Sequence, residues 1–265
     1  MNDIRVSRSD ETVRFNDAGA VARFGLIALA TDLTSERDLY RQLPGEQVSI
    51  HVTRVAYENP TTPENLLKMA PRLTEAAQLL APLKPLKAIC YSCTAASVVI
   101  GDDAIAASIQ TGAGSVPVVT PTGAARMAFA ALGVRRIAIL TPYTVATTEP
   151  MAAYFASHGL VVSGVQCLGL EDDREMARVS DETIVKAAMA VDTPDAEALF
   201  LSCTGLPAIN VIAELEQRCG KPVVTSNQAS AWAMARLGGL AGHRPPQFGR
   251  LFDCALPDRG VGAAA

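Results

Sequence analysis

Short runs of Val, Ile and Leu recur along the chain, and longer Ala-rich or amphipathic stretches separate them. The short runs show no regular polar alternation, which is typical of parallel strands covered on both faces of a sheet. We therefore predict an α/β fold in which helices alternate with strands. The predicted strands are 24–30, 47–53, 86–91, 116–119, 136–140, 160–166, 197–201 and 222–225. The predicted helices are 63–80, 121–131, 147–157, 180–190, 206–218 and 226–236.

The second half of the chain repeats features of the first half. The triplet Ser-Cys-Thr at 92–94 returns at 202–204, 110 positions later, and Thr31 and Thr141, which each end an apolar run, have the same spacing. The stretch "VPVVTPTGAARMAFAALG" matches "KPVVTSNQASAWAMARLG" at a slightly shorter spacing, so the first half carries a small insertion. A duplication of this kind predicts two related lobes.

We predict two pseudo-symmetric parallel-sheet lobes with the active site in the cleft between them. The predicted divisions are a polar N-terminal segment 1–20, a first lobe 21–122 that also takes part of the C-terminal segment, a second lobe 123–240, and a C-terminal segment 241–265. Each lobe then carries one of the two Ser-Cys-Thr triplets.

Composition excludes several classes of partner. The formal net charge is −4 and the 23 Lys and Arg residues are scattered, so the sequence shows no basic patch for nucleic acid. The start of the chain lacks an apolar signal core, and no later apolar run approaches the roughly 18 residues of a membrane span. We expect a cytoplasmic protein with a small-molecule substrate that works as a homo-oligomer.

The duplicated cysteines are the strongest chemical signal. Cys93 and Cys203 follow predicted strands, and ligands of parallel sheets gather at the carboxyl ends of strands. The start of a following helix is expected to stabilise a thiolate, and its free N–H groups, with the hydroxyls of Thr94 and Thr204, would bind a carboxylate or an oxyanion.

Two opposed thiols suit a reaction in which one group removes a proton from a carbon and the other returns a proton to its opposite face. Cys93 alone has an alternative interpretation, as a structural cysteine in a tight turn. Cys90-x-x-Cys93 also has the spacing of a redox or metal motif, but no second such pair occurs and the three histidines are isolated. We predict no metal and no cofactor.

At this point the sequence resembles a known family. The segments "GLIALATDLTSERD", "ICYSCTAAS", "IAILTPYT", "GLEDDREMARVS" and "LFLSCTGLPAINVIAELEQRCGKPVVTSNQASAWAMARLGG" are similar to the aspartate/glutamate racemase superfamily, specifically its maleate isomerase and arylmalonate decarboxylase branch. Within that branch the block "ATDLTSERD" is most similar to the ectoine-utilisation (EutA) proteins.

The resemblance implies a cofactor-free site between two lobes. Relatives with both cysteines are isomerases and racemases, whereas the decarboxylases keep only the second, so the presence of both favours isomerisation. Tyr143 matches the family's tyrosine, a hydrogen-bond donor to a substrate carboxylate. Ala95 and Gly205, each two residues after a cysteine, complete the predicted binding segments.

Two positions depart from the maleate isomerase pattern. Asp32 and Asp173 stand where asparagines are expected, so a dicarboxylate would meet like charge and a cationic amine or amidine would gain a partner. Asp32 has an alternative role as a helix cap, and Asp173 as an exposed loop acid.

Our first hypothesis is an isomerase or racemase that transfers protons next to a carboxylate or amidine, with hydroxyectoine or ectoine utilisation as its expected context. The alternatives are a maleate-type cis–trans isomerase in which a thiolate adds to the double bond, an arylmalonate-type decarboxylase, and a non-catalytic protein that binds small carboxylates.

Overall fold

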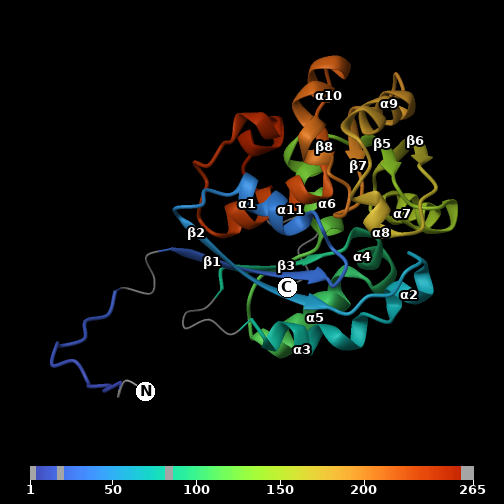
Figure 1. The fold of residues 1–265 in the computed structure, drawn as a ribbon. Coiled ribbons are helices and arrows are strands. Elements are labelled where there is room, and N and C mark those ends of the chain that lie inside the picture. The colour runs from blue at the N-terminus through green and yellow to red at the C-terminus, as the bar shows by residue number, and fades with distance from the viewer. Residues whose placement is uncertain (1–3, 17–20, 81–85, 258–265) are drawn as a thin grey trace.

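The computed structural model describes residues 4–16, 21–80 and 86–257 (Figure 1). In this part of the chain the strands form two four-stranded parallel sheets, ordered β2-β1-β3-β4 and β6-β5-β7-β8. The first sheet contains β1 (Ala22–Leu29), β2 (Val48–Val55), β3 (Ala88–Ser92) and β4 (Val118–Val119). The second contains β5 (Arg136–Thr141), β6 (Val161–Cys167), β7 (Ala198–Leu201) and β8 (Val223–Thr225). All eight predicted strands are present, and the predicted α/β class with two similar parallel sheets is confirmed.

The sheet register corrects one detail of the expected repeat. β3 and β7 are equivalent, since each leads into a Ser-Cys-Thr triplet. In β1, Phe24 pairs with Ala88, and in β5, Ile137 pairs with the equivalent Ala198. Thr141 therefore corresponds to Ala28 and not to Thr31. The reason is that the segment between β2 and β3 in the first half is longer than the equivalent segment between β6 and β7 in the second half.

The helices differ more from the prediction. The expected helix 63–80 is divided into α2 (Pro63–Leu67), a 3₁₀ turn (Ala70–Arg72) and α3 (Leu73–Gln78), because Pro71 cannot donate a helix-interior hydrogen bond. Two helices after β3, α4 (Thr94–Ile100) and α5 (Asp102–Ala113), were not expected. The remaining helices are α1 (Ser35–Gln42), α6 (Pro121–Ala131), α7 (Val145–Ser157), α8 (Asp173–Met176), α9 (Asp181–Val191), α10 (Ile212–Cys219) and α11 (Ser226–Leu237).

Helices α6 and α11 lie between the two sheets and pack against each other (Figure 1). Both contact β3 and β8, and α11 also contacts β4 and α1. Ten of the twelve residues of α11 are buried. The helix that follows β8 therefore forms part of the core beside the first sheet, and its first turn lies near the ends of β3 and β7.

The C-terminal segment is fastened to one face of α11. Gln228 Nε2 donates to the carbonyl of Phe248 at 2.6 Å, Trp232 Nε1 donates to the carbonyl of Cys254 at 3.0 Å, and Arg236 Nε donates to the same carbonyl at 2.9 Å. The three donors are spaced four residues apart, so they lie on one side of the helix.

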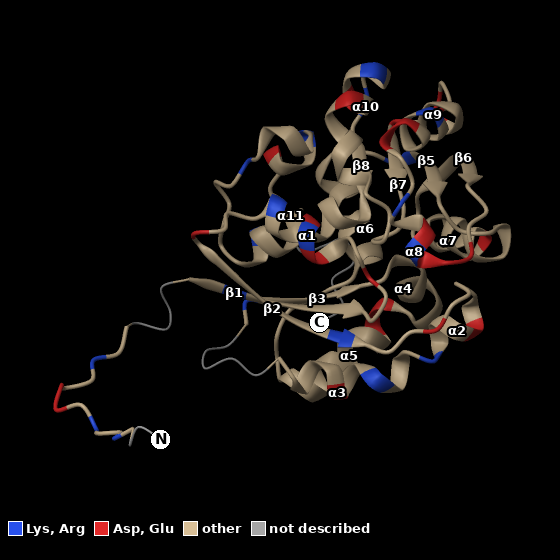
Figure 2. Cartoon of the chain, in the orientation of Figure 1, with Lys and Arg blue, Asp and Glu red and all other residues tan. Residues whose placement is uncertain are grey.

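The ends of the chain carry less structure. Residues 4–16 form no helix or strand and are exposed, and 1–3, 17–20 and 258–265 lie outside the described residues. The predicted lobe boundaries stay predictions. Figure 2 shows Lys and Arg spread over many elements and mixed with Asp and Glu. No helix among the described residues has the length and apolar character needed to cross a bilayer.

Candidate active site

A cavity lies where the carboxyl ends of the two sheets meet, and both halves of the chain line it. The first half contributes Leu29, Asp32, Leu33, Tyr57, Thr61, Leu66, Cys93 and Ala95. The second half contributes Tyr143, Asp173, Met176, Cys203, Thr204 and Gly205. The structure thus brings together eight of the nine residues predicted from the sequence.

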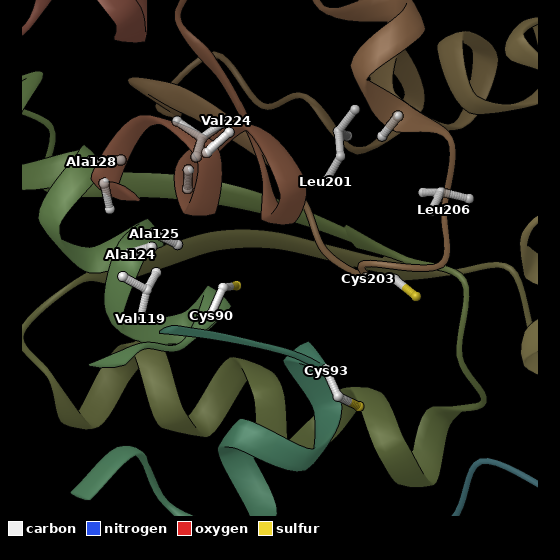
Figure 3. Packing of buried hydrophobic residues seen from close by; sticks show 14 of the residues in the cluster. Cys90, Cys93, Val119, Ala124, Ala125, Ala128, Leu201, Cys203, Leu206 and Val224 are labelled. Atoms are coloured by element: carbon white, nitrogen blue, oxygen red, sulfur yellow. The ribbon is translucent and has the colours of Figure 1, made fainter. Parts of the chain in front are cut away.

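Cys93 enters the cavity directly from the end of β3. All five residues of that strand are buried, and Cys93 is the N-cap residue of α4 with 7% of its surface exposed. Cys90 is 1% exposed inside the strand and does not line the cavity. Figure 3 shows the sulfurs of Cys93 and Cys203 on the same side of the view, away from Cys90. The two cysteines therefore occupy different places, with Cys90 in the core of β3 and Cys93 at the cavity, and do not form a paired redox or metal motif.

Cys203 lies in a strained turn after β7. Its φ of +124° falls in a region that residues other than glycine rarely adopt. The N–H of Gly205 donates to Cys203 Sγ at 3.2 Å, and the N–H of Cys203 donates to Ser226 Oγ at 3.0 Å. The turn therefore aims the sulfur at the donors that follow it in the chain.

Both thiols are harder to ionise than the sequence suggested. Burial raises the pKa of Cys203 to about 11, although hydrogen bonds from Tyr143 and from the N–H groups of Gly205 and Leu206 lower it. Burial raises the pKa of Cys93 further, and a hydrogen bond from the backbone of Ala96 opposes this. Burial thus opposes the expected stabilisation of the thiolates by helix starts, because the loss of water outweighs the hydrogen-bond donors at each sulfur.

These pKa shifts predict an unusual pH dependence of thiol alkylation. Because only the thiolate reacts, labelling of Cys203 by iodoacetamide should rise about tenfold per pH unit from about pH 8 to its pKa of about 11. Cys93, with equal exposure and the higher pKa, should react more slowly throughout. Peptide mass spectrometry would measure both rates, with glutathione as the control thiol. A plateau near pH 9 or faster labelling of Cys93 would contradict this.

Asp32 both caps a helix and lines the cavity. Its Oδ1 accepts the N–H groups of Thr34 at 2.7 Å and Ser35 at 2.8 Å, and its Oδ2 accepts the Ser35 hydroxyl at 2.5 Å. These bonds satisfy N–H groups at the start of α1, although the N-cap residue itself is Thr34, so Asp32 meets the helix-cap alternative in part. Burial raises the pKa of Asp32, and the same hydrogen bonds oppose that rise. The acid is thus a fixed group at the cavity wall.

Asp173 is held at the cavity wall by residues from the first half of the chain. Asn59 Nδ2 donates to its Oδ1 at 2.9 Å, and the Thr31 hydroxyl donates to its Oδ2. The residue is half-buried at the start of α8. The alternative interpretation of Asp173 as an exposed loop acid is therefore wrong.

The threonine hydroxyls do not serve as predicted. Thr94 does not line the cavity, and its hydroxyl donates to Ser226 Oγ at 2.8 Å. Thr204 lines the cavity, but its hydroxyl donates to the carbonyl of Ser92 at 3.1 Å. Both side chains are buried between the halves, where a hydroxyl needs a protein partner, so they join the two cysteine segments instead of facing a ligand.

Sequence reasoning missed part of the cavity wall. Tyr57 and Thr61 come from the segment after β2, and the Tyr57 hydroxyl lies 2.7 Å from Thr61 Oγ1. Tyr57 could have been found because it follows a strand end, as both cysteines do. Leu66 and Met176 carried no comparable signal, since they belong to short helices whose packing the sequence does not specify.

The charge of the cavity wall has one sign. Of the described residues that line it, two are acids and none is Lys, Arg or His. Among the described residues, no group of three or more His, Cys, Asp or Glu side chains is placed to hold a metal ion. The described lining residues thus give the cavity wall an acidic character.

Comparison with known proteins agrees with this geometry. A family model described as arylmalonate decarboxylase matches residues 61–252. The chain belongs to this family. It is 39% identical to arylmalonate decarboxylase of Bordetella bronchiseptica over 140 residues, which are 52% of this chain and 58% of that protein. It is 27% identical to maleate isomerase of Nocardia farcinica over 227 residues, which are 82% of this chain and 90% of that protein.

Solved structures of the family have the same fold. The Nocardia farcinica maleate cis–trans isomerase with a covalently bound succinylcysteine intermediate superposes with a TM-score of 0.79 at 26% identity, covering 88% of this chain and 98% of that one. A liganded glycine-to-cysteine, cysteine-to-serine mutant of arylmalonate decarboxylase gives 0.77 at 29% identity, covering 88% and 99%. These matches confirm the predicted maleate isomerase and arylmalonate decarboxylase branch and the predicted isomerase class.

Proposed function

We propose that this family member is a cofactor-independent isomerase or racemase in which Cys93 and Cys203 transfer protons at a carbon next to a carboxylate or amidine. The observation that carries the proposal is one cavity with both thiols, two acids and no basic side chain among its described lining residues. Two thiols supply a base and an acid for opposite faces of one carbon. The acids select a substrate that also bears a cationic group.

The cationic group of the substrate also helps one of the two thiols to ionise and so to act as the base. Besides burial, the carboxylates of Asp173 and Asp32 raise the pKa of Cys93, as does Cys203 once it is ionised, and the carboxylate of Asp173 raises the pKa of Cys203. A bound cation offsets the charge of the acids, so one thiol loses its proton more easily when substrate is present. That thiolate takes the substrate proton, and the other thiol donates its own proton to the opposite face.

Ectoine-type compounds fit this description, since each combines one carboxylate with one amidinium group. The similarity of the block "ATDLTSERD" to the ectoine-utilisation proteins supports the same substrate class. That block contains Asp32, which lines the cavity. We therefore propose that the enzyme acts in hydroxyectoine or ectoine utilisation.

A stereochemical assay tests the proposed function. Single enantiomers of hydroxyectoine, of ectoine and of acyclic amino acids would be incubated with the enzyme and followed by chiral chromatography. We expect inversion for at least one substrate that bears a carboxylate and a cation, and neither isomerisation of maleate nor decarboxylation of an arylmalonate. Turnover of maleate alone would overturn the proposed substrate class, and the absence of all turnover would favour a binding protein.

Maleate-type cis–trans isomerisation is the second candidate. The succinylcysteine intermediate of the Nocardia farcinica enzyme favours it, because that relative has 26% identity and the same fold. Decarboxylation is a weaker candidate, since this chain keeps both cysteines. The expected homo-oligomeric state and cytoplasmic location stay predictions, which light scattering and cell fractionation would test.

A further inference from the structure

The first turn of α11 contacts both cysteine segments through one hydroxyl. Ser226 Oγ accepts the N–H of Cys203 at 3.0 Å and the hydroxyl of Thr94 at 2.8 Å. Ser226 has no exposed surface. The buried side chain of Ser226 therefore links the backbone of Cys203 to the side chain of Thr94, the residue after Cys93.

The next residue holds the other side of the Cys203 turn. Asn227 Nδ2 donates to the carbonyl of Thr204 at 2.9 Å and to Asp38 Oδ2 at 2.9 Å. Asp38 is fully buried in α1, and Asn227 is 3% exposed. Because a carboxylate oxygen only accepts hydrogen bonds when ionised, Asp38 requires the nitrogen of the Asn227 amide, and not its oxygen, to face this point.

These contacts surround the strained residue. The N–H of Cys203 and the carbonyl of Thr204 are held by successive side chains of α11, and between them Cys203 has a φ of +124°. Strained backbone of this kind persists only where its surroundings fix it. In this conformation the N–H of Gly205 reaches Cys203 Sγ at 3.2 Å.

We propose that Ser226 and Asn227 are positioning residues that hold Cys203 in its strained turn, and that Asp38 fixes the orientation of the Asn227 amide. The inference rests on the proposed catalytic use of Cys203. Neither Ser226, Asn227 nor Asp38 lines the cavity, so they act on the reaction only through the position of the thiol. Relaxing the turn should move the sulfur away from its N–H donors and make its ionisation harder.

The test compares alkylation of the two cysteines within one molecule. In Ser226→Ala and Asn227→Ala, the iodoacetamide rate of Cys203 relative to that of Cys93 should fall at least about threefold at fixed pH, which corresponds to about half a pKa unit. Asp38→Leu keeps most of the side-chain volume, removes the acceptor of the Asn227 amide and should lower the same ratio. This third variant keeps the test decisive if an alanine variant fails to fold.

Ser230→Ala is the matched control. Ser230 is also buried in α11, but its hydroxyl donates to the carbonyl of Ser226 inside the helix, so the ratio should not change. A ratio that is unchanged or higher in the folded variants, or equally lowered in Ser230→Ala, would overturn the proposal. The readout needs no substrate, so failure of the proposed reaction would appear separately, as absent turnover by the unaltered enzyme.

Discussion

Replacing either Cys93 or Cys203 by serine is expected to lower kcat/KM for isomerisation by about 10²–10⁴-fold, because this is what a positioned acid or base contributes and serine is a far weaker acid than cysteine. Serine is nearly the same size, so the fold should remain. Steady-state kinetics in both directions, with circular dichroism for the fold, would measure the effect.

Cys90→Ala is the control for this experiment. Cys90 is buried in β3, three residues before Cys93, but lies outside the cavity. We expect a modest loss of stability, about 1 kcal/mol, and near-normal turnover. If Cys93→Ser or Cys203→Ser kept near-full activity, that cysteine would be structural and the two-thiol mechanism would be lost.

Neutralising the cavity acids should change charge preference. Asp173→Asn and Asp32→Asn are each expected to weaken binding of a substrate with an amine or amidine by about 1–3 kcal/mol, the range for a charge-assisted hydrogen bond, and to improve binding of plain dicarboxylates. Asparagine is also a good helix cap, so Asp32→Asn should keep most of the capping of α1. Calorimetry with one cationic and one dianionic ligand would give both affinities.

Glu175→Gln is the matched control for charge. Glu175 lies in α8 with Asp173 but is exposed and does not line the cavity. The ratio of the affinities of Glu175→Gln for the cationic and the dianionic ligand should therefore equal that of the unaltered protein. An unchanged ratio in both aspartate variants would show that the acids are structural. The maleate-type reaction would then be the better account.

The sequence predicted the framework of this protein better than its details. The strand before Cys93 could be recognised because a short, nearly continuous apolar run is typical of a strand buried on both faces of a parallel sheet, and all of its residues are buried. The duplicated triplet placed both thiols at strand ends. Helix α4 was missed because its sequence, "TAASVVI", mixes small and β-branched residues without an amphipathic pattern.

The remaining errors concern tertiary environment. Thr94 follows Cys93 in sequence, but only the folded chain shows that its hydroxyl donates to Ser226, which lies 132 positions later in the chain. The raised pKa of each thiol depends on how completely the two halves of the chain exclude water from it. A local sequence motif does not predict that burial. For Asp173 the sequence leaves the alternative of an exposed loop acid open, because its partners, Thr31 and Asn59, lie far away in the chain.

Deuterium uptake from heavy water tests the two-thiol proton transfer most directly. An enantiopure substrate with a carboxylate and a cation would be converted in D₂O, and early product and remaining substrate would be examined by mass spectrometry and NMR. The account predicts one deuterium at the inverted carbon of the product and none in the unreacted substrate, because the thiol that donates has exchanged with solvent while the other removes protium. Inverted or isomerised product without deuterium, accompanied by a covalent adduct on Cys93 or Cys203, would contradict it.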